Sequence, residues 1–268
     1  MLRFGGGDLP TAASVGAGRR VWAIGDIHGC ADLLRALLTQ ILAMESLFTP
    51  PRLVFLGDYV DRGPSSRDVL DLLVSLKESS RLSPAFVRGN HDFMMQEFLL
   101  KPEIGPAWIG MGAGPTLASY GVAPPALSVS PQAWRDTQAR FADAVPQRHR
   151  EFLDSLEPSA VEGGYFFTHA GVRPGKPIDR QRASDLMWIR SAFLDDKRRL
   201  GKTVVHGHTV TTDPHEDHRR IGLDTGAYAS GKLTAVCIEG ASRRFLQVKR
   251  TGPSSIVPFW DVSSSALA

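Results

Sequence analysis

The sequence predicts a layered α/β fold whose polar loops gather at the carboxyl ends of the strands. Two observations lead to this prediction. A short apolar run, a polar turn and an amphipathic helical stripe follow one another twice before residue 80, and a third apolar run occupies 85–87. Alternation of this kind is typical of parallel sheets, in which the loops after the strands meet at one edge. We therefore expect functional side chains at that edge.

The length and composition are those of a folded globular protein. The chain has 268 residues, 43% hydrophobic and 22% charged, enough for one large domain or two small ones. A net charge of +3 and a pI of about 9.0 suit an anionic substrate, but no Lys/Arg run or aromatic-basic interleaving points to nucleic acid. The two cysteines, Cys30 and Cys237, form no CxxC pair, which favours a reducing cytoplasm. No segment predicts a signal peptide or a membrane span.

The first half of the domain supplies the expected strand and helix pairs. Residues 1–18 are expected to be flexible, and strands are expected at 21–24, 53–56 and 85–87. An apolar stripe predicts a helix from residue 33 to about Ser46. The stretch Ser65-Ser-Arg-Asp68 resembles a capping box and predicts the start of a second helix.

The second half begins with a change of character. Residues 93–160 contain scattered Pro and Gly residues and two helical stretches, at about 131–143 and 147–156. We interpret this region as a helical insertion that covers one side of the site. The insertion lies within a single domain that spans residues 19–250. Strands at 165–168, 203–205, 221–223, 233–238 and 245–248 follow, with a helix at about 183–198 and a final hairpin. The Ser/Pro-rich tail, 251–268, is expected to be loosely ordered, although Phe259-Trp260 could dock.

Five of the predicted strand ends carry ligand-type residues. One such residue would usually be a helix cap or a surface group, but five in order, each beside a glycine that permits a sharp turn, are not explained by coincidence. Five of the eight histidines lie in these turns. The clusters are Asp26 and His28; Asp58 and Asp61; Asn90, His91 and Asp92; His169; and His206 and His208.

The ligand types predict a pair of metal ions. Carboxylate, imidazole and amide oxygen suit Mn²⁺, Fe or Zn²⁺, and the lack of cysteine argues against a structural zinc site. A carboxylate between two cations can bridge them. Two ions roughly 3.5–4 Å apart can then share a hydroxide and clamp a phosphoryl group for in-line attack.

Three of these turns resemble known signature motifs. Gly25-Asp-Ile-His-Gly29, Gly57-Asp-Tyr-Val-Asp-Arg-Gly63 and Gly89-Asn-His-Asp92 resemble those of the phosphoprotein phosphatase family, within the calcineurin-like metallophosphoesterases. His169-Ala-Gly171 and Gly207-His-Thr209 resemble its two later histidine motifs, and the insertion, with Thr116-Leu-Ala-Ser-Tyr-Gly121, resembles the bacterial branch. The resemblance spans roughly residues 20–240. It implies a four-layer α/β/β/α sandwich with a dimetal site at one edge.

The resemblance also implies a role for each site residue. One metal would be held by Asp26, His28 and Asp58, and the second by Asp58, Asn90, His169 and His208. His91 would protonate the leaving alkoxide, with Asp61 orienting and charging it. The phosphate would be bound by Arg62, by Asn90 and, in a looser motif, by Arg190.

Several other residues receive simpler interpretations. Asp92 stands where many family members have glutamate, and His206 is expected to be a second-shell or core histidine rather than a ligand. Cys30 is expected to pack at a helix start, and Trp108, Trp134 and Trp188 in the core or the insertion. The remaining polar residues are expected at the surface: His149, His215, His218, Arg198-Arg199 and Arg219-Arg220.

By this resemblance the protein is a dinuclear metal-dependent phosphomonoesterase. The resemblance favours a serine/threonine protein phosphatase that acts on a phosphorylated protein or a small phosphoester. The expected cofactors are two divalent metal ions, with Mn preferred over Fe or Zn. One alternative is a hydrolase of symmetrical dinucleoside tetraphosphates, which typically lacks the aspartate present at Asp61. The other is a non-catalytic phosphate-binding protein, against which the complete ligand set argues.

Overall fold

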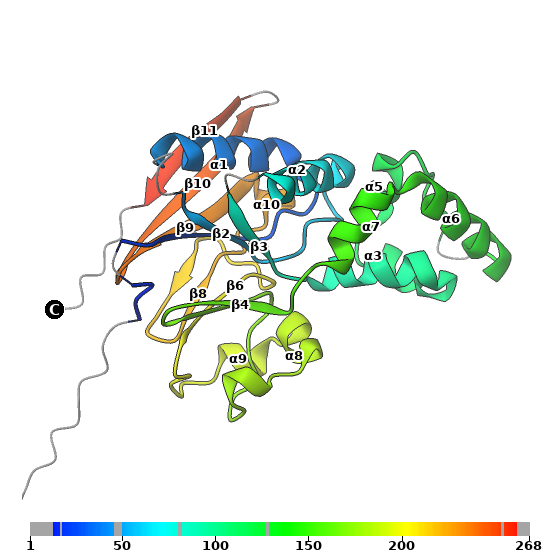
Figure 1. The fold of residues 1–268 in the computed structure, drawn as a ribbon. Helices are drawn as coiled ribbons and strands as arrows, with labels where there is room; N and C mark the ends of the chain where they lie inside the picture. The colour runs from blue at the N-terminus through cyan, green and yellow to red at the C-terminus, as the bar shows by residue number, and fades with distance from the viewer. Residues whose placement is uncertain are drawn as a thin grey trace, which may run out of the picture.

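Two mixed β-sheets packed face to face form the centre of the molecule (Figure 1). The computed structural model describes residues 13–16, 18–45, 50–79, 82–126, 129–252 and 255–261, with side chains to residue 258. The first sheet has the order β11-β10-β9-β1-β2-β3 and the second β4-β5-β6-β8-β7. The first contains β1 (Arg20–Ile24), β2 (Arg52–Phe55), β3 (Ser83–Phe86), β9 (Lys232–Glu239), β10 (Ser242–Gly252) and β11 (Ser255–Asp261). The second contains β4 (Ser159–Glu162), β5 (Tyr165–Thr168), β6 (Thr203–His206), β7 (His215–Glu216) and β8 (Arg220–Gly222).

Helices cover both outer faces of this pair of sheets. Helices α1 (Ala31–Met44) and α2 (Ser66–Glu78) lie on the first sheet, and α8 (Ala183–Trp188) and α9 (Ser191–Leu194) lie on the second (Figure 1). The short helices η2 (Ile178–Arg180) and α10 (Ala227–Ser230) lie in loops. No helix in the described part of the chain combines the length and apolar character that crossing a bilayer requires.

The alternation of side chains along the strands creates three separate cores. In β1, Trp22 and Ile24 pack in the core beneath α1 and α2, whereas Val21 and Ala23 belong to the core between the sheets. In β5, Phe166 packs toward the α8–α9 side. Because successive side chains of a strand point to opposite faces, each sheet contributes to two cores. The expected four-layer sandwich is therefore confirmed.

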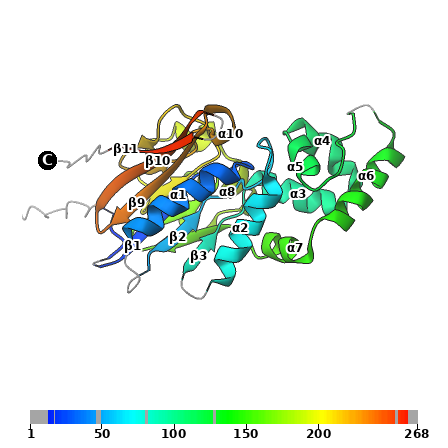
Figure 2. The same ribbon diagram turned by 90° about the horizontal axis from the view of Figure 1, so that it is seen from above.

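The insertion consists of helices beside this sandwich. It contains α3 (Asn90–Leu100), η1 (Pro102–Ile104), α4 (Gly105–Gly110), α5 (Gly114–Ser119), α6 (Pro131–Ala144) and α7 (Gln147–Asp154). Figure 2 shows these helices extending from the α2 side of the sandwich. Aromatic side chains hold them together: Phe98 lies 5.1 Å from Trp108 and 6.3 Å from Trp134 between ring centroids. Trp108 and Trp134 are buried, as expected, and belong to the core that continues under α1 and α2.

Four expected elements differ from the structure. The helix expected at 183–198 is two short helices, because Ile189 is extended (ψ 141°) and ends α8. Residues 255–261 of the expected loose tail form β11, paired with β10, although the side chains of Phe259-Trp260 lie outside the described residues. Ser65 precedes α2 but makes no side-chain capping hydrogen bond, so the capping-box prediction is wrong. Of the N-terminal segment, residues 1–12 lie outside the described residues, and Val15 is buried against Gly240.

Three side-chain environments also differ from expectation. His149 is fully buried between Tyr120 and Asp71, not at the surface. Arg219 is buried, donating to the carbonyl of Phe193, because the aromatic ring and carbonyl of α9 receive the guanidinium. Trp188 is 41% exposed rather than a core residue, because α8 ends there.

Candidate metal centre

The carboxyl ends of the parallel strands of both sheets meet at one edge. Strands β1, β2 and β3 are mutually parallel, as are β5, β6 and β8. Backbone hydrogen bonds join the loops that follow them: the N–H groups of Ile27 and His28 donate to the carbonyl of Asp58, and Gly207 N–H donates to the carbonyl of His169. The arrangement brings the predicted motifs from distant parts of the chain into one cluster.

The loops are held in unusual backbone conformations. Five non-glycine residues of the described chain have positive φ, between 44° and 73°. Such conformations are costly for residues with a Cβ and cluster at functional sites. All five belong to the predicted motifs: His28, Asp58, Asp61, Arg62 and His208. The fold therefore accepts local strain at the place where the ligand-type side chains converge.

Two groups of buried side chains have the spacing of metal ligands. His28, Asp58 and His91 form one, and Asp58, His169 and His208 form the other, with the ligand atoms of each group within 4.8 Å of one another. Asp58 belongs to both, as a bridging carboxylate must. Asn90 extends the second group, since its Oδ1 lies 2.9 Å from Nε2 of His169.

Hydrogen bonds fix the orientation of two imidazoles. Nδ1 of His28 lies 2.9 Å from the carbonyl of Val60, and Nδ1 of His169 lies 2.9 Å from the carbonyl of Leu56. A ring nitrogen facing a carbonyl carries a proton, so Nε2 is the nitrogen of each ring that a metal could bind. Burial disfavours the charged form of His169, but the Asp58 carboxylate outweighs burial and raises the pKa of His169 to about 10, so a metal ion would have to displace the Nε2 proton of that ring. Burial lowers the pKa of His28 to about 3 and that of His208 to about 2. The rings of His28 and His208 are therefore neutral, as metal ligands need to be.

Asp26 belongs to neither of the two groups but lies beside them. Its Oδ2 accepts a hydrogen bond from the backbone N–H of His208 at 3.0 Å. Among the described side chains, Oδ1 of Asp26 and Nε2 of His208 are buried with no hydrogen-bond partner. Buried polar atoms are rarely left unpaired, so both need a ligand. These unpaired atoms and the clustered carboxylate and imidazoles fit a pair of divalent cations.

Asp92 supports the metal site from behind. Its Oδ2 accepts from the backbone N–H groups of Asp58 and Gly89, at 2.9 and 3.0 Å, and its Oδ1 accepts from that of Tyr59 at 2.9 Å. The side chain is short enough to sit at the start of α3 and long enough to fix the turn that carries Asp58. Asp92, which stands where many family members have glutamate, thus makes three hydrogen bonds that hold the backbone of the site.

A histidine–aspartate pair lies next to the candidate metal ligands. Nδ1 of His91 lies 2.7 Å from Oδ2 of Asp61, and both side chains are buried. Burial alone would lower the pKa of His91, but the carboxylates of Asp58 and Asp61 outweigh it and raise the pKa above its usual value. Arg62 joins the pair to the cluster: Nη1 and Nη2 lie 3.1 and 3.0 Å from Nε2 of His28 and His91.

The rim of the site is partly exposed. Arg190 is exposed at the start of α9, and its Nη1 donates to the carbonyl of His208 at 3.1 Å. The ring of Tyr228, 38% exposed, lies edge-on to His28 at 5.4 Å and beneath the guanidinium of Arg62 at 4.9 Å. Trp188 lies 6.5 Å from His208 on another side. The rim thus offers both cationic and aromatic groups.

His206 does not join the metal ligands. Its ring packs edge-on against Phe193 at 5.2 Å, and its Nε2 faces Arg220 at 3.2 Å. The expectation of a core histidine is confirmed. Strand β6 ends at His206, and His208 adopts a left-handed conformation (φ 65°), so the side chain of His208 lies with the candidate ligands although that of His206 does not. Cys30 is buried at the start of α1, as expected.

Sequence reasoning missed three residues at the site. Asp224 follows β8, is buried, and has an unpaired Oδ2. The apolar run Ile221-Gly-Leu223 before it repeats the pattern of an apolar strand followed by a ligand-type residue that identified the other five ends. Trp108 and Thr116 of the insertion both hydrogen-bond to Asp61. Thr116 begins the stretch that resembles the bacterial branch, but nothing in the local sequence connects either residue with Asp61, because both reach the site through the packing of the insertion.

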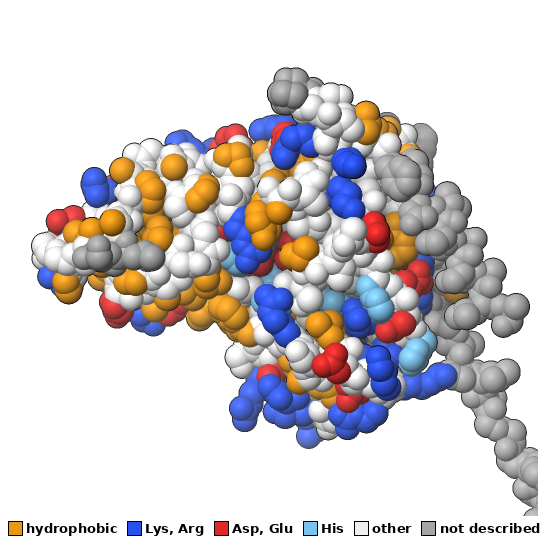
Figure 3. All heavy atoms as spheres, turned by 180° about the vertical axis from the view of Figure 1, so that it is seen from behind, with side chains coloured by type: hydrophobic (Ala, Val, Ile, Leu, Met, Phe, Trp, Pro, Cys, Tyr) orange, Lys and Arg blue, Asp and Glu red, His pale blue; other side chains and the backbone are white. Residues whose placement is uncertain are grey.

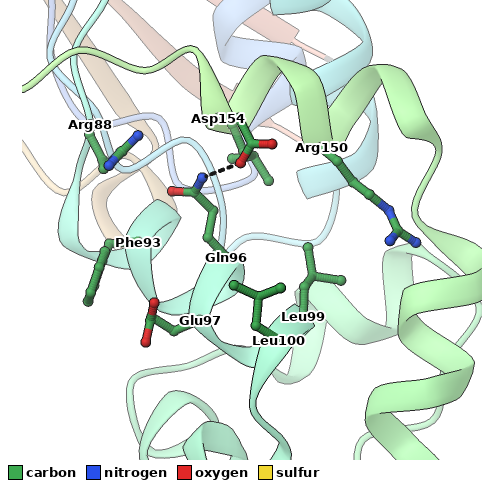
Figure 4. Close-up of a pocket in the computed structure, with 9 residues that line it drawn as sticks. Arg88, Phe93, Gln96, Glu97, Leu99, Leu100, Arg150 and Asp154 are labelled. Carbon is green, nitrogen blue, oxygen red and sulfur yellow. Dashed lines mark hydrogen bonds between the residues drawn. The ribbon is translucent and has the colours of Figure 1, made fainter.

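A separate cavity of about 230 Å³ lies between α3 and α7 (Figure 4). Gln96 and Asp154 are joined across it by a hydrogen bond of 3.0 Å. None of the proposed metal ligands lines this cavity, so we do not assign it to the metal centre.

The fold and the cluster together define a metal-dependent phosphoesterase. A model of the family described as calcineurin-like phosphoesterase matches residues 19–236, and the chain belongs to this family. The family uses two divalent metal ions, in agreement with the two overlapping ligand groups.

Several named proteins are similar to this chain over most of its length. A bis(5'-nucleosyl)-tetraphosphatase PrpE [asymmetrical] of Geobacillus sp. is 30% identical, with 79% of this chain and 87% of the relative covered. A PrpE [asymmetrical] of Bacillus mycoides is 26% identical, with 88% and 94% covered. A symmetrical bis(5'-nucleosyl)-tetraphosphatase of Vibrio cholerae is 26% identical, with 80% and 93% covered.

Two solved structures share the fold. A putative diadenosine tetraphosphatase has a TM-score of 0.57 at 22% identity, with 95% of this chain and 97% of the other covered. A cold-active protein tyrosine phosphatase has a TM-score of 0.58 at 16% identity, with 86% and 76% covered. At these identities the likeness concerns the fold alone, and the fold carries more than one kind of phosphatase.

Proposed function

We propose that the protein hydrolyses phosphate monoesters that have an alkoxide leaving group, with phosphoserine and phosphothreonine in proteins as the substrate class. The observation that carries the proposal is the buried pair of His91 and Asp61 beside the metal ligands. An alkoxide is a poor leaving group and needs a proton as the P–O bond breaks, whereas a phosphate leaving group does not. An intact, oriented acid is therefore matched to monoester chemistry.

Asp26, His28 and Asp58 are the proposed ligands of one ion, and Asp58, Asn90, His169 and His208 those of the other. Two divalent cations supply Lewis-acid activation of the phosphoryl group and of water when bound. Mn²⁺ is the proposed native metal because the ligands are mostly oxygen and imidazole. His91 lies within the first group of ligand-type side chains, but its hydrogen bond to Asp61 favours the role of an acid over that of a ligand. The Asp61 carboxylate can hold the proton of His91 on Nδ1 and leave Nε2 to face the substrate.

Arg62 and Arg190 are the proposed phosphate-binding residues. The guanidinium of Arg62 donates to Nε2 of His91 and lies within the ligand cluster. A phosphate dianion is a stronger acceptor, so its binding would draw Arg62 away and free Nε2 of His91 to hold the acid proton. Cationic side chains also gather over α8, α9 and the adjoining loops (Figure 3), where they favour an anionic substrate: Lys176, Arg180, Arg182, Arg190, Lys197 and Arg199.

A second candidate is the hydrolysis of dinucleoside tetraphosphates. Two observations favour it: the names of the relatives, and the exposed aromatic rings of Tyr228 and Trp188 at the rim. Stacking of a base on an aromatic ring is worth about 1–3 kcal/mol, and this site offers two such rings. The Asp61 carboxylate gives no advantage for this substrate, whose phosphate leaving group needs little protonation.

A side-by-side assay tests the two candidates. The Mn²⁺-loaded protein is given a phosphothreonine peptide and both symmetrical and asymmetrical cleavage of diadenosine tetraphosphate are monitored, with kcat/KM compared. We expect the peptide to be preferred, and His91→Asn to reduce peptide hydrolysis by about 10²–10⁴-fold while reducing dinucleotide hydrolysis less. A wild-type preference for the dinucleotide would replace the first candidate by the second. Inactivity on both substrates and on aryl phosphates would revive a non-catalytic role.

A further inference from the structure

The carboxylate of Asp61 is held by more than its histidine partner. Its Oδ1 accepts a hydrogen bond from the hydroxyl of Thr116 at 2.7 Å. Its Oδ2 accepts from the indole N–H of Trp108 at 2.8 Å, the same oxygen that faces His91. Asp61, Trp108 and Thr116 are all fully buried. The carboxylate is therefore surrounded by three donors, two of which come from the insertion.

Thr116 also holds the backbone of Asp61. The N–H of Asp61 donates to the hydroxyl oxygen of Thr116 at 2.9 Å and to that of Ser66 at 3.1 Å. Asp61 has a left-handed backbone (φ 73°), which needs such outside support. One hydroxyl thus fixes both the main chain and the side chain of Asp61.

These contacts have a direct chemical meaning. The two oxygens of Asp61 face three hydrogen-bond donors at 2.7–2.8 Å, so the carboxylate acts as an acceptor toward His91. An Asp61 that only accepts requires the proton of His91 on Nδ1, which fixes the ring so that Nε2 faces the metal ligands. Loss of the hydrogen bond from Trp108 or Thr116 would let the carboxylate of Asp61 rotate or exchange partners. The imidazole of His91 would then no longer be held in one orientation.

We propose that Trp108 and Thr116 are positioning residues for the His91–Asp61 acid, and that through it the helical insertion sets how poor a leaving group the enzyme can expel. The inference rests on the proposed role of His91 as the acid. It adds that the acid is assembled from two parts of the chain: the turn after β2 supplies Asp61, and helices α4 and α5 supply the two groups that orient it.

The experiment compares Thr116→Val and Trp108→Phe with the wild type on two substrates, a phosphothreonine peptide and p-nitrophenyl phosphate, all proteins loaded with Mn²⁺. We expect kcat for the peptide to fall on the order of 10²-fold, the cost of misplacing a catalytic group. For the aryl ester, which needs little protonation, we expect a much smaller loss. KM and metal content should stay at wild-type values, and Thr116→Ser, which keeps the hydroxyl, should restore peptide activity.

Matched controls exist in the same insertion. Trp134→Phe removes an indole from the same aromatic cluster, and Thr137→Val removes a buried hydroxyl that donates to the carbonyl of Ala133. Both carry a packing cost like that of the test variants but touch no part of the acid. We expect them to leave the ratio of the two activities unchanged.

Double variants make the test decisive. In a His91→Asn background, Thr116→Val and Trp108→Phe should cause no further loss, because residues that act through one group are not additive. Equal losses on both substrates, or full additivity with His91→Asn, would overturn the inference while leaving the acid role of His91 intact. Equal losses on both substrates for His91→Asn itself would instead refute the acid role, and the inference with it. If Thr116→Val does not fold, Trp108→Phe and its control carry the same comparison.

Discussion

A Cβ on Gly207 would lie only 1.8 Å from Oδ1 of Asp26. The next residue, His208, donates its backbone N–H to Oδ2 of the same carboxylate at 3.0 Å. The end of β1 in one sheet therefore touches the loop after β6 in the other, and Asp26 fits there because residue 207 has no side chain.

The first prediction follows from this contact. Gly207→Ala should displace the carboxylate of Asp26 and lower metal affinity and activity by about 10–100-fold, the usual effect of disturbing a ligand through its neighbour. Elemental analysis of the purified variant, together with a metal titration, measures the loss. Gly222→Ala is the matched control, because the nearest atom to its Cβ, in the ring of His206, lies at 3.4 Å. Full metal content in Gly207→Ala would remove Asp26 from the ligand set.

The second prediction concerns Asp58, which belongs to both ligand groups. Asp58→Asn removes the negative charge that two cations would share, so we expect the metal content to fall from about two ions per chain toward one or none. Activity should fall by more than the about 100-fold of an outer-shell change. Asp213→Asn, at a side chain that is 76% exposed, serves as the control. A variant that keeps two ions would contradict the bridge.

The third prediction concerns Arg62, whose guanidinium lies between His28 and His91. A lysine keeps the charge but cannot make the two parallel hydrogen bonds of a guanidinium. Losing one charge-assisted bond costs about 1.5–3 kcal/mol, so kcat/KM for the phosphopeptide should fall by about 10–10²-fold in Arg62→Lys. Metal content should be unaffected. Arg35→Lys, on the exposed face of α1, should behave like wild type, and unchanged kinetics in Arg62→Lys would exclude phosphate binding by Arg62.

The fourth prediction concerns the stability of the insertion at low pH. Burial lowers the pKa of His149 below its ordinary value, even though Asp71 acts in the opposite direction. The unfolded chain therefore takes up a proton at higher pH than the folded chain does. Folding stability from the neutral ring is complete above about pH 6.5 and is lost as pH falls toward the folded pKa, by at most about 1.4 kcal/mol per pH unit.

Urea unfolding between pH 7.5 and 5 tests this effect. His149→Gln cannot titrate in this range but can still hydrogen-bond to Tyr120 and Asp71. The free energy of unfolding of the wild type should fall more steeply below pH 6.5 than that of the variant. His218→Gln, which replaces an exposed histidine, should retain the wild-type slope. Parallel curves for wild type and His149→Gln would show that His149 does not couple folding to pH.

The side chains that gather at the candidate metal centre could be predicted because each lies within a few residues of the end of a strand. Once β1, β2, β5 and β6 were expected from their apolar runs, the geometry of parallel strands placed Asp26, Asp58, His169 and His208 at one edge. The final hairpin followed from the same patterns and is confirmed. The four-layer order, also confirmed, was implied by the family resemblance and not by these patterns. Only the resemblance to a family indicated that His208, and not His206, is the expected ligand.

Features created by tertiary packing could not be predicted from the sequence. His149 lies in the charged run Gln147-Arg-His-Arg150, which is typical of a surface, and is buried only because α7 packs against α2 with Asp71 facing it. The apolar spacing from Leu186 to Phe193 resembles one helix, yet Ile189 is extended and Arg190 (φ −130°, ψ −108°) turns toward the site. Trp108 and Thr116 reach Asp61 from 47 and 55 residues away.

Substitutions that relieve the left-handed backbone conformations of the site should stabilise the fold while removing function. Each of His28, Asp58, Asp61, Arg62 and His208 holds a conformation that costs about 1 kcal/mol or more for a residue with a Cβ. Glycine or asparagine would relieve that cost at any of them and would remove a proposed metal ligand, acid partner or phosphate contact. A descendant released from selection for catalysis is therefore expected to drift toward glycine and asparagine at these five positions and to become a more stable pseudoenzyme with the same fold.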